Sequence, residues 1–251
     1  MKTLKTTVLL ALLFCFTFNF AQAQQRYQIH QDNVRPSSVG EYEKVAKEFL
    51  EACIEHNPQS PWIAAQTYDN RYMYISPLDN FAELDKKPFA EMAEVMGDDF
   101  GDMFKRFDKC YDSHTDYIIT LSESLTYMPE GISQMQEGLN HRKWIHIYYT
   151  PANGKNVYDA MKGIKDLFAE KDSKEYYRVY RSGFGSPENH LIVAISSKDE
   201  IDAATRSKAN NELLGEAAEE VFGKLMSSIE RMEEYSGSMR PDLSYSPKEE
   251  E

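Results

Sequence analysis

Two segments with the same pattern, one in the middle of the chain and one at its end, constrain the fold more than any other feature. The first reads SLTYMPEG over residues 124–131, and the second reads DLSYSPKE over residues 242–249. Leu, a hydroxyl residue, Tyr and Pro therefore recur in one order, 118 positions apart. An ordered series of such matches predicts an internal duplication, against the alternative of coincidence between two aromatic-rich halves. Further matches keep nearly the same offset: Ile29–His30 with Ile145–His146 at 116, Tyr42 with Tyr158 at 116, and Ile75–Ser76 with Ile195–Ser196 at 120.

Each half carries the hydrophobic pattern of one β-α-β-β-α-β unit, with the closing segments above as its last strand. Alternating apolar residues predict strands, and apolar residues at helical spacing predict helices. For the first half we expect strands at 26–31, 61–68, 70–76 and 116–127, and helices at 35–58, 76–84 and 88–111. For the second half we expect strands at 143–149, 176–182, 189–196 and 240–245, and helices at 153–171, 196–204 and 210–235.

This unit is the ferredoxin-like fold, in which helices cover only one face of the sheet. The other face must be buried, and a second copy of the unit can bury it. We therefore expect an α+β fold of two tandem ferredoxin-like repeats that pack sheet to sheet as an α+β barrel within one chain. The expected organisation is a signal peptide at 1–23, repeat 1 at 24–129, a linker at 130–142, repeat 2 at 143–247 and an acidic tail at 248–251.

The repeated motifs resemble the dimeric α+β barrel superfamily in a fused, tandem-repeat form. The resemblance rests on the paired Ile-His strands, the corners YISPLDNFAEL and AISSKDEIDAA, and the two closing segments. The superfamily includes cofactor-free monooxygenases, haem-handling enzymes, small isomerases and proteins of no known activity. The resemblance thus implies a fold and leaves the activity open.

The N-terminus predicts export. Lys2 and Lys5 precede a mostly apolar run over 8–20, and Ala21-Gln22-Ala23 matches the cleavage pattern of a secretory signal peptide. An uncleaved membrane anchor is the alternative, but this run is shorter than the roughly 20 residues that span a bilayer. We expect a mature protein that begins at Gln24 and works in the periplasm or outside the cell.

The charge of the mature chain limits its partners. Without Lys2 and Lys5, 28 − 2 = 26 basic residues face 41 acidic ones. Such a surface repels nucleic acids and anionic membranes, so a small molecule is the expected partner. Because one chain supplies both sheets, a monomer is sufficient, although a dimer is possible. Cys53 and Cys110 are expected as free thiols, although the compartment would permit a disulfide.

Strand alternation gives the candidate site. The faces opposite the aliphatic ones should point into the barrel, where polar aromatic tips suit a ligand cavity. The alternatives for the two histidines are hydrogen-bonded structural groups and, less favoured, metal or haem ligands. An acidic run at 91–102 is expected to be a solvated helix face rather than a cation site. The candidate ligand-binding residues are His30, Tyr72, Tyr74, Trp144, His146 and Tyr148.

Two functions from different classes remain. The first is a non-catalytic, exported module that binds a small ligand in the barrel or serves a structural role. The second is an oxidative enzyme, either cofactor-free or haem-handling. No motif for a nucleophile, a metal site or a phosphate loop occurs in the sequence, so we expect no bound cofactor and no metal.

Overall fold

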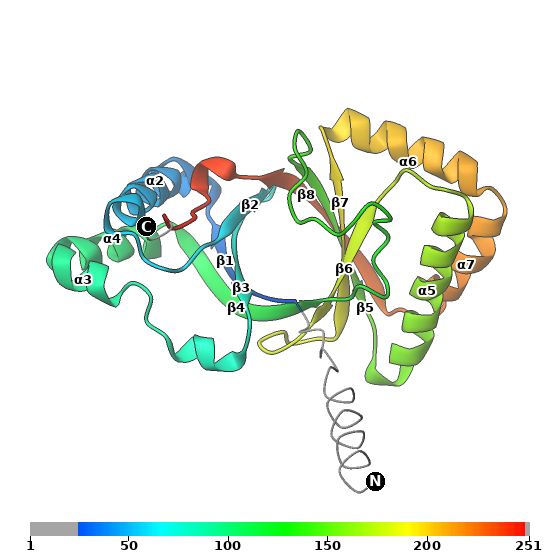
Figure 1. The fold of residues 1–251 in the computed structure, drawn as a ribbon, viewed down its shortest axis with the longest axis horizontal. Coiled ribbons are helices and arrows are strands. Elements are labelled where there is room, and N and C mark those ends of the chain that lie inside the picture. The colour runs from blue at the N-terminus through cyan, green and yellow to red at the C-terminus, as the bar shows by residue number, and fades with distance from the viewer. Residues whose placement is uncertain (1–24, 249–251) are drawn as a thin grey trace, which may run out of the picture.

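The computed structural model describes residues 25–248, so the predicted signal peptide and the last three acidic residues lie outside the described part of the chain. Eight antiparallel strands close into a barrel in the order β1-β3-β2-β8-β5-β7-β6-β4. The helices lie outside this barrel, in two groups on opposite sides (Figure 1). The predicted α+β barrel within one chain is therefore confirmed.

The first half contains four strands and three α-helices. Helix α2 ends where Asn57 adopts a left-handed conformation, directly before a proline. A single helix was expected over 88–111, but Gly97, with a φ of 58°, separates it into two. The helix expected at 76–84 is wrong, because β3 continues through this start and a 3₁₀ turn follows at Phe81–Asp85. The elements are β1 (Arg26–Val34), α2 (Val39–His56), β2 (Ile63–Thr67), β3 (Arg71–Leu78), α3 (Ala90–Met96), α4 (Asp98–Asp108) and β4 (Tyr111–Leu121).

The second half repeats this order. The helix expected over 210–235 is wrong at its end, because Arg231–Met239 forms strand β8. This strand pairs with β5 on one side and with β2 of the first half on the other, so tertiary pairing overrides the helical pattern. The elements are β5 (His141–Tyr148), α5 (Gly154–Glu170), β6 (Tyr177–Ser182), β7 (His190–Ser197), α6 (Glu200–Leu214), α7 (Ala217–Met226) and β8.

The closing segment of repeat 1 crosses to the opposite half. It was expected to be part of the last strand, but β4 ends at Leu121, before the segment begins. Leu125 and Tyr127 lie in the hydrophobic core of the second half, beside the buried face of α5. Tyr127 also pairs with Tyr177 at the start of β6.

The closing segment of repeat 2 makes the reciprocal crossing. Leu243 and Tyr245 lie in the core of the first half, and Tyr245 pairs with Trp62 just before β2. The indole Nε1 of Trp62 donates a hydrogen bond of 2.8 Å to the carbonyl of Leu243. The red segment that follows β8 accordingly lies beside α2 in Figure 1. The two closing segments therefore join the halves of the barrel, because each packs into the hydrophobic core of the other half.

The two halves differ in how their helices cover the sheet. In the second half, only two residues separate β7 from α6, and a continuous core of Val157, Met161, Ile164 and Phe168 fills the space under the helices. In the first half, residues 79–89 separate β3 from α3. This longer connection leaves an open groove between sheet and helices.

Candidate functional site

The inward-facing side chains enclose a small cavity of about 80 Å³ inside the barrel. Trp144 and His146 of β5 line it, as the sequence predicted. Tyr148 has the same parity at the end of β5, where its ring packs on His146 and His190 and the Arg231 guanidinium lies 3.6 Å above it. Other strands contribute Tyr27, Ile29 and Gln31 from β1, Met73 and Ile75 from β3, Tyr117 and Ile119 from β4, and Ile192 and Ala194 from β7.

The expected interior position is wrong for the three candidates of repeat 1. His30 and Tyr74 line the groove on the helix side of the sheet. Tyr72 is buried against α2, where its hydroxyl donates a hydrogen bond of 2.8 Å to Glu43 Oε1. The three candidates of repeat 2 thus lie on the inward face of β5, and the three of repeat 1 lie on the helix side of the sheet. Whether any of them binds a ligand stays a prediction.

An alignment error of one residue explains this reversal. The offset of 116 placed His30 on His146, but strand pairing makes Gln31 the equivalent of His146, at 146 − 31 = 115, because Gln31 lies opposite Met73 of β3 as His146 lies opposite Ile192 of β7. The buried helix positions have the same offset, since Tyr42 of α2 corresponds to Val157 of α5, at 157 − 42 = 115. Because side chains alternate along a strand, a shift of one residue exchanges the two faces completely.

The groove on the helix side of repeat 1 is the larger site, with a volume of about 720 Å³. This lies in the range of about 300–1,000 Å³ that is usual for small-molecule pockets. The connection over 79–89 contributes one side, and the sheet and α2 contribute the floor. Eight aromatic side chains line it: Tyr42, Phe49, Trp62, Tyr74, Phe89, Phe104, Phe107 and Tyr111.

His30 lies on the floor of this groove between two carboxylates. Its Nδ1 is 2.9 Å from Asp116 Oδ1, and its Nε2 is 3.2 Å from Asp32 Oδ1. Burial alone would lower the pKa of His30, but contact with Asp32 and Asp116 raises it to about 9. The side chain is therefore an imidazolium at neutral pH. Asp32 also accepts a 2.6 Å hydrogen bond from Tyr42, whose hydroxyl lies 3.1 Å from that of Tyr74.

Acidic groups dominate the charged lining of the groove. Besides the His30 imidazolium, Lys86 is the lysine that lines it. The carboxylates around it are Asp32, Asp79, Glu83, Asp108 and Asp116. A carboxylate ligand would be repelled here, whereas a hydrogen-bond donor or a cation would be attracted.

His146 has the opposite electrostatic environment. Its burial inside the barrel, together with the nearby His190, lowers its pKa to about 4. The two rings stack with centroids 5.2 Å apart, and Tyr235 meets His146 edge-on at the same distance. His146 is therefore neutral at pH 7 and belongs to an aromatic cluster at one end of the cavity.

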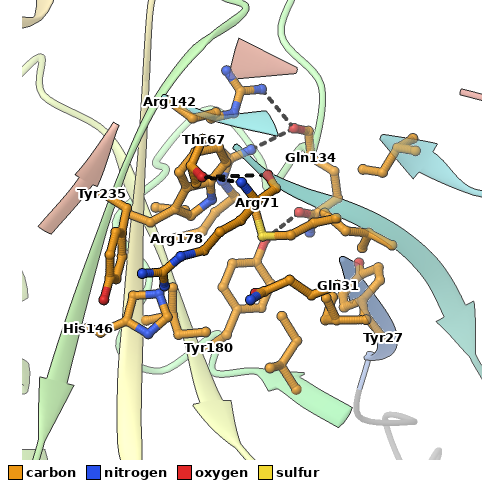
Figure 2. Close-up of a pocket in the computed structure, with 18 of the residues that line it drawn as sticks. Tyr27, Gln31, Thr67, Arg71, Gln134, Arg142, His146, Arg178, Tyr180 and Tyr235 are labelled. Carbon is orange, nitrogen blue, oxygen red and sulfur yellow. Dashed lines mark hydrogen bonds between the residues drawn. The ribbon is translucent and has the colours of Figure 1, made fainter. Parts of the chain in front are cut away.

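Several polar residues that line the cavity were not predicted from the sequence, among them Gln31, Thr67 and Arg71. Arg142 and Arg178 lie on the inward faces of β5 and β6, and Gln134 of the linker closes one end (Figure 2). Strand parity could have identified Arg142, because it precedes the predicted inward residue Trp144 by two positions. No inward face was predicted for the strand that carries Arg178. Nothing in the linker sequence predicted that Gln134 would enter the barrel.

The described residues were also compared with the requirements of metal sites, membrane-spanning helices and reactive thiols. Over 25–248, no three His, Cys, Asp or Glu side chains gather as a metal site, and no helix is long and apolar enough to cross a bilayer. Cys53 and Cys110 are buried free thiols, as the sequence favoured. Burial raises the pKa of Cys53 to about 12, so this thiol is unreactive at neutral pH.

Several solved structures have a similar architecture. An anthrone oxidase-like protein superposes with a TM-score of 0.60 at 10% identity, over 86% of this chain and 92% of that one. A monooxygenase-like protein from Fusobacterium nucleatum gives 0.53 at 10% identity, over 86% and 93%. Chlorite dismutase from Candidatus Nitrospira defluvii gives 0.51 at 8% identity, over 87% and 92%.

The chain has the fold of the dimeric α+β barrel superfamily. Both halves of the barrel belong to one polypeptide, as in the fused form expected from the repeat. No protein-family profile and no curated protein matches the sequence, so no narrower family is defined. At these identities the structural likeness concerns the fold and not the activity.

Haem does not fit the two histidines that the sequence singled out. An iron ligand needs a neutral imidazole nitrogen with a free lone pair, but His30 is protonated and both its nitrogens face carboxylates. His146 is neutral, but it faces a cavity of about 80 Å³. An engineered apolar cavity of about 150 Å³ binds benzene, a molecule far smaller than haem. We therefore derive no chemistry through haem at either residue.

Proposed function

We propose that this protein binds a small aromatic molecule that carries hydrogen-bond donors or a positive charge, in the helix-side groove of repeat 1. The observation that carries the proposal is the combination of an aromatic-walled groove of about 720 Å³ with an acidic floor. Aromatic walls favour a flat ligand, and they also attract cations through their π faces. The carboxylates of Asp32 and Asp116 then accept hydrogen bonds from its hydroxyl or ammonium group.

We further propose that binding occurs outside the cytoplasm, on the strength of the predicted signal peptide. The acidic surface of the mature chain suits a neutral or cationic small molecule and disfavours nucleic acid. Because one chain closes the whole barrel, the groove is complete in a monomer.

The natural positions of the two tryptophans allow each cavity to be tested separately. The sequence contains only two, of which Trp62 lines the groove and Trp144 lines the barrel interior. Fluorescence of the Trp144→Phe variant therefore reports on the groove, and that of Trp62→Phe reports on the interior. We expect tyramine, an aromatic cation with a phenol, to change Trp62 emission saturably and to leave Trp144 emission unchanged.

Matched ligands and variants sharpen this experiment. The carboxylate analogue 3-(4-hydroxyphenyl)propionate should bind at least about tenfold more weakly than tyramine, because the groove floor repels it. Asp116→Asn should weaken tyramine binding, whereas Asp112→Asn, on the same strand but outside the groove lining, should not. Equal affinity for both ligands, or a response carried by Trp144, would contradict the proposal.

A second candidate function is oxidation of such a ligand by dioxygen without a bound cofactor. The observation that favours it is the charged Asp32–His30–Asp116 group, which can accept and relay a proton from a phenol or an activated C–H bond. The structural neighbours described as anthrone oxidase-like and monooxygenase-like are consistent with it. Dioxygen uptake with anthrone should then be faster with the protein than without it, and this acceleration should fall in Asp116→Asn. Uptake that is equal in the parent and this variant would remove the candidate.

A further inference from the structure

Two arginines are buried at one end of the barrel interior without a carboxylate partner. Arg142 is 2% exposed and Arg178 is 3% exposed, and both line the interior cavity. Among residues 25–248, the ion pairs of the structure include neither of them. A buried guanidinium is normally neutralised by an acidic group, because removing its charge from water is costly.

Their hydrogen-bond partners are neutral. Arg178 Nη1 donates to the carbonyls of Ser133 and Gln134, at 2.6 and 2.8 Å, and its Nη2 donates to Ser196 Oγ at 2.6 Å. Arg142 Nη2 donates to the same Gln134 carbonyl at 3.2 Å. The two guanidinium groups therefore share one carbonyl and lie close together, as Figure 2 shows.

Donors remain unused around this pair. Arg178 Nε and Gln134 Nε2 are buried and have no hydrogen-bond partner. Gln134 is held in place because its Oε1 accepts a hydrogen bond from the Tyr180 hydroxyl. Both residues line the cavity, so a small ligand there would lie beside the positive charge and these unpaired donors.

We propose that this end of the barrel binds a small oxyanion, of the size of formate, acetate or nitrate, beside Arg142 and Arg178. A planar oxyanion accepts the parallel hydrogen bonds that a guanidinium offers. It would supply the missing negative charge and a partner for Arg178 Nε. The volume of about 80 Å³ limits the ligand to a few heavy atoms. This site differs from the proposed groove in position, charge and ligand class.

The electrostatics of the arginine pair agree with this geometry. Burial, followed by repulsion from Arg178, lowers the pKa of Arg142 to about 10. Burial also lowers the pKa of Arg178. Both shifts mean that the charged forms are destabilised in the ligand-free cavity, which an anion would relieve.

Isothermal titration calorimetry with sodium formate, acetate and nitrate tests the proposal on the mature protein. We expect saturable one-to-one binding of at least one of these anions, with a matching change in Trp144 emission in the Trp62→Phe variant. Arg178→Met should weaken binding at least tenfold. Arg181→Met is the matched control, because Arg181 lies on the same strand but is exposed, and it should leave the affinity unchanged.

Two outcomes would overturn the proposal. One is the absence of saturable binding for all three anions in the parent protein, which does not depend on any variant folding. The other is equal affinity in the parent and in folded Arg178→Met, which would assign the arginines to holding the linker in the barrel. Tyramine binding in the groove serves as an independent readout, since loss of the oxyanion site should not change it.

Discussion

His30 and His146, which the repeat pattern aligned, should have pKa values on opposite sides of pH 7. Contacts with Asp32 and Asp116 raise the pKa of His30 to about 9, and burial lowers that of His146 to about 4. Both start from an ordinary value of 6.5. Imidazole NMR signals, assigned with His30→Gln and His146→Gln, should therefore show one histidine charged and one neutral at pH 7.

The two histidines should also give opposite pH dependences of stability. The His30 stabilisation is fully present below pH 6.5 and is lost as the pH rises through 9, because the raised pKa belongs to the folded state. The difference 9 − 6.5 = 2.5 corresponds to at most about 3.4 kcal/mol. Since the side chain is 39% exposed, solvent screening reduces this to about 1 kcal/mol.

For His146 the signs reverse. Its stabilisation is present above pH 6.5 and is lost as the pH falls through 4, because the lowered pKa belongs to the folded state. The difference 6.5 − 4 = 2.5 corresponds to about 3 kcal/mol for this largely buried ring.

Urea unfolding at several pH values measures both effects. His30→Gln should remove the decline of unfolding free energy between pH 6.5 and 9, and His146→Gln should reduce the decline between pH 6.5 and 4. His56→Gln, at the end of α2 and outside both cavities, is the control. A His30 signal that titrates below pH 7, or a His146 signal that titrates above it, would refute the assignment of faces on which the groove proposal depends.

Three further predictions concern the framework. Tyr42→Phe should lower the unfolding free energy by about 1–2 kcal/mol, because it removes the buried donor to a carboxylate; thermal and urea unfolding measure this. Gly237→Ala should disrupt the pairing of β2 with β8, because an added Cβ would lie 2.0 Å from the carbonyl oxygen of Gln66. Gly223→Ala in α7 is the control, because its Cβ meets no atom within 4 Å, and it should raise the unfolding free energy by up to about 1 kcal/mol. Cys53 should react with a thiol reagent only on unfolding, and fast labelling of the native protein would contradict its burial.

The sequence alone determined most of the local elements and the duplicated order in which they follow one another. Helical spacing of Tyr42, Val45 and Ala46 fixed the buried face of α2, because a helix must turn its apolar stripe toward the sheet. Alternation likewise fixed Trp144 and His146 as a common face of β5. The duplicated order was also legible, and a sheet with helices on one face requires a second layer, so the barrel could be predicted.

Only the tertiary structure decided which face of repeat 1 points inward. Strand pairing sets the register, and an alignment of the two repeats that is one residue out exchanges the two faces of a strand. His30 therefore lies in a groove and not in the barrel. The groove itself depends on the long connection at 79–89, whose path no local pattern specifies.

The long-range partnerships were equally invisible in the sequence. The closing motifs were recognised as repeated, but their exchange between the halves depends on the two seams that join β2 to β8 and β4 to β6. The sequence does not show that the guanidinium groups of Arg142 and Arg178 are buried. Only the folded structure shows that both are buried without a carboxylate partner. Periodicity is a property of neighbours along the chain, whereas burial, charge pairing and cavities arise between residues that only folding brings together.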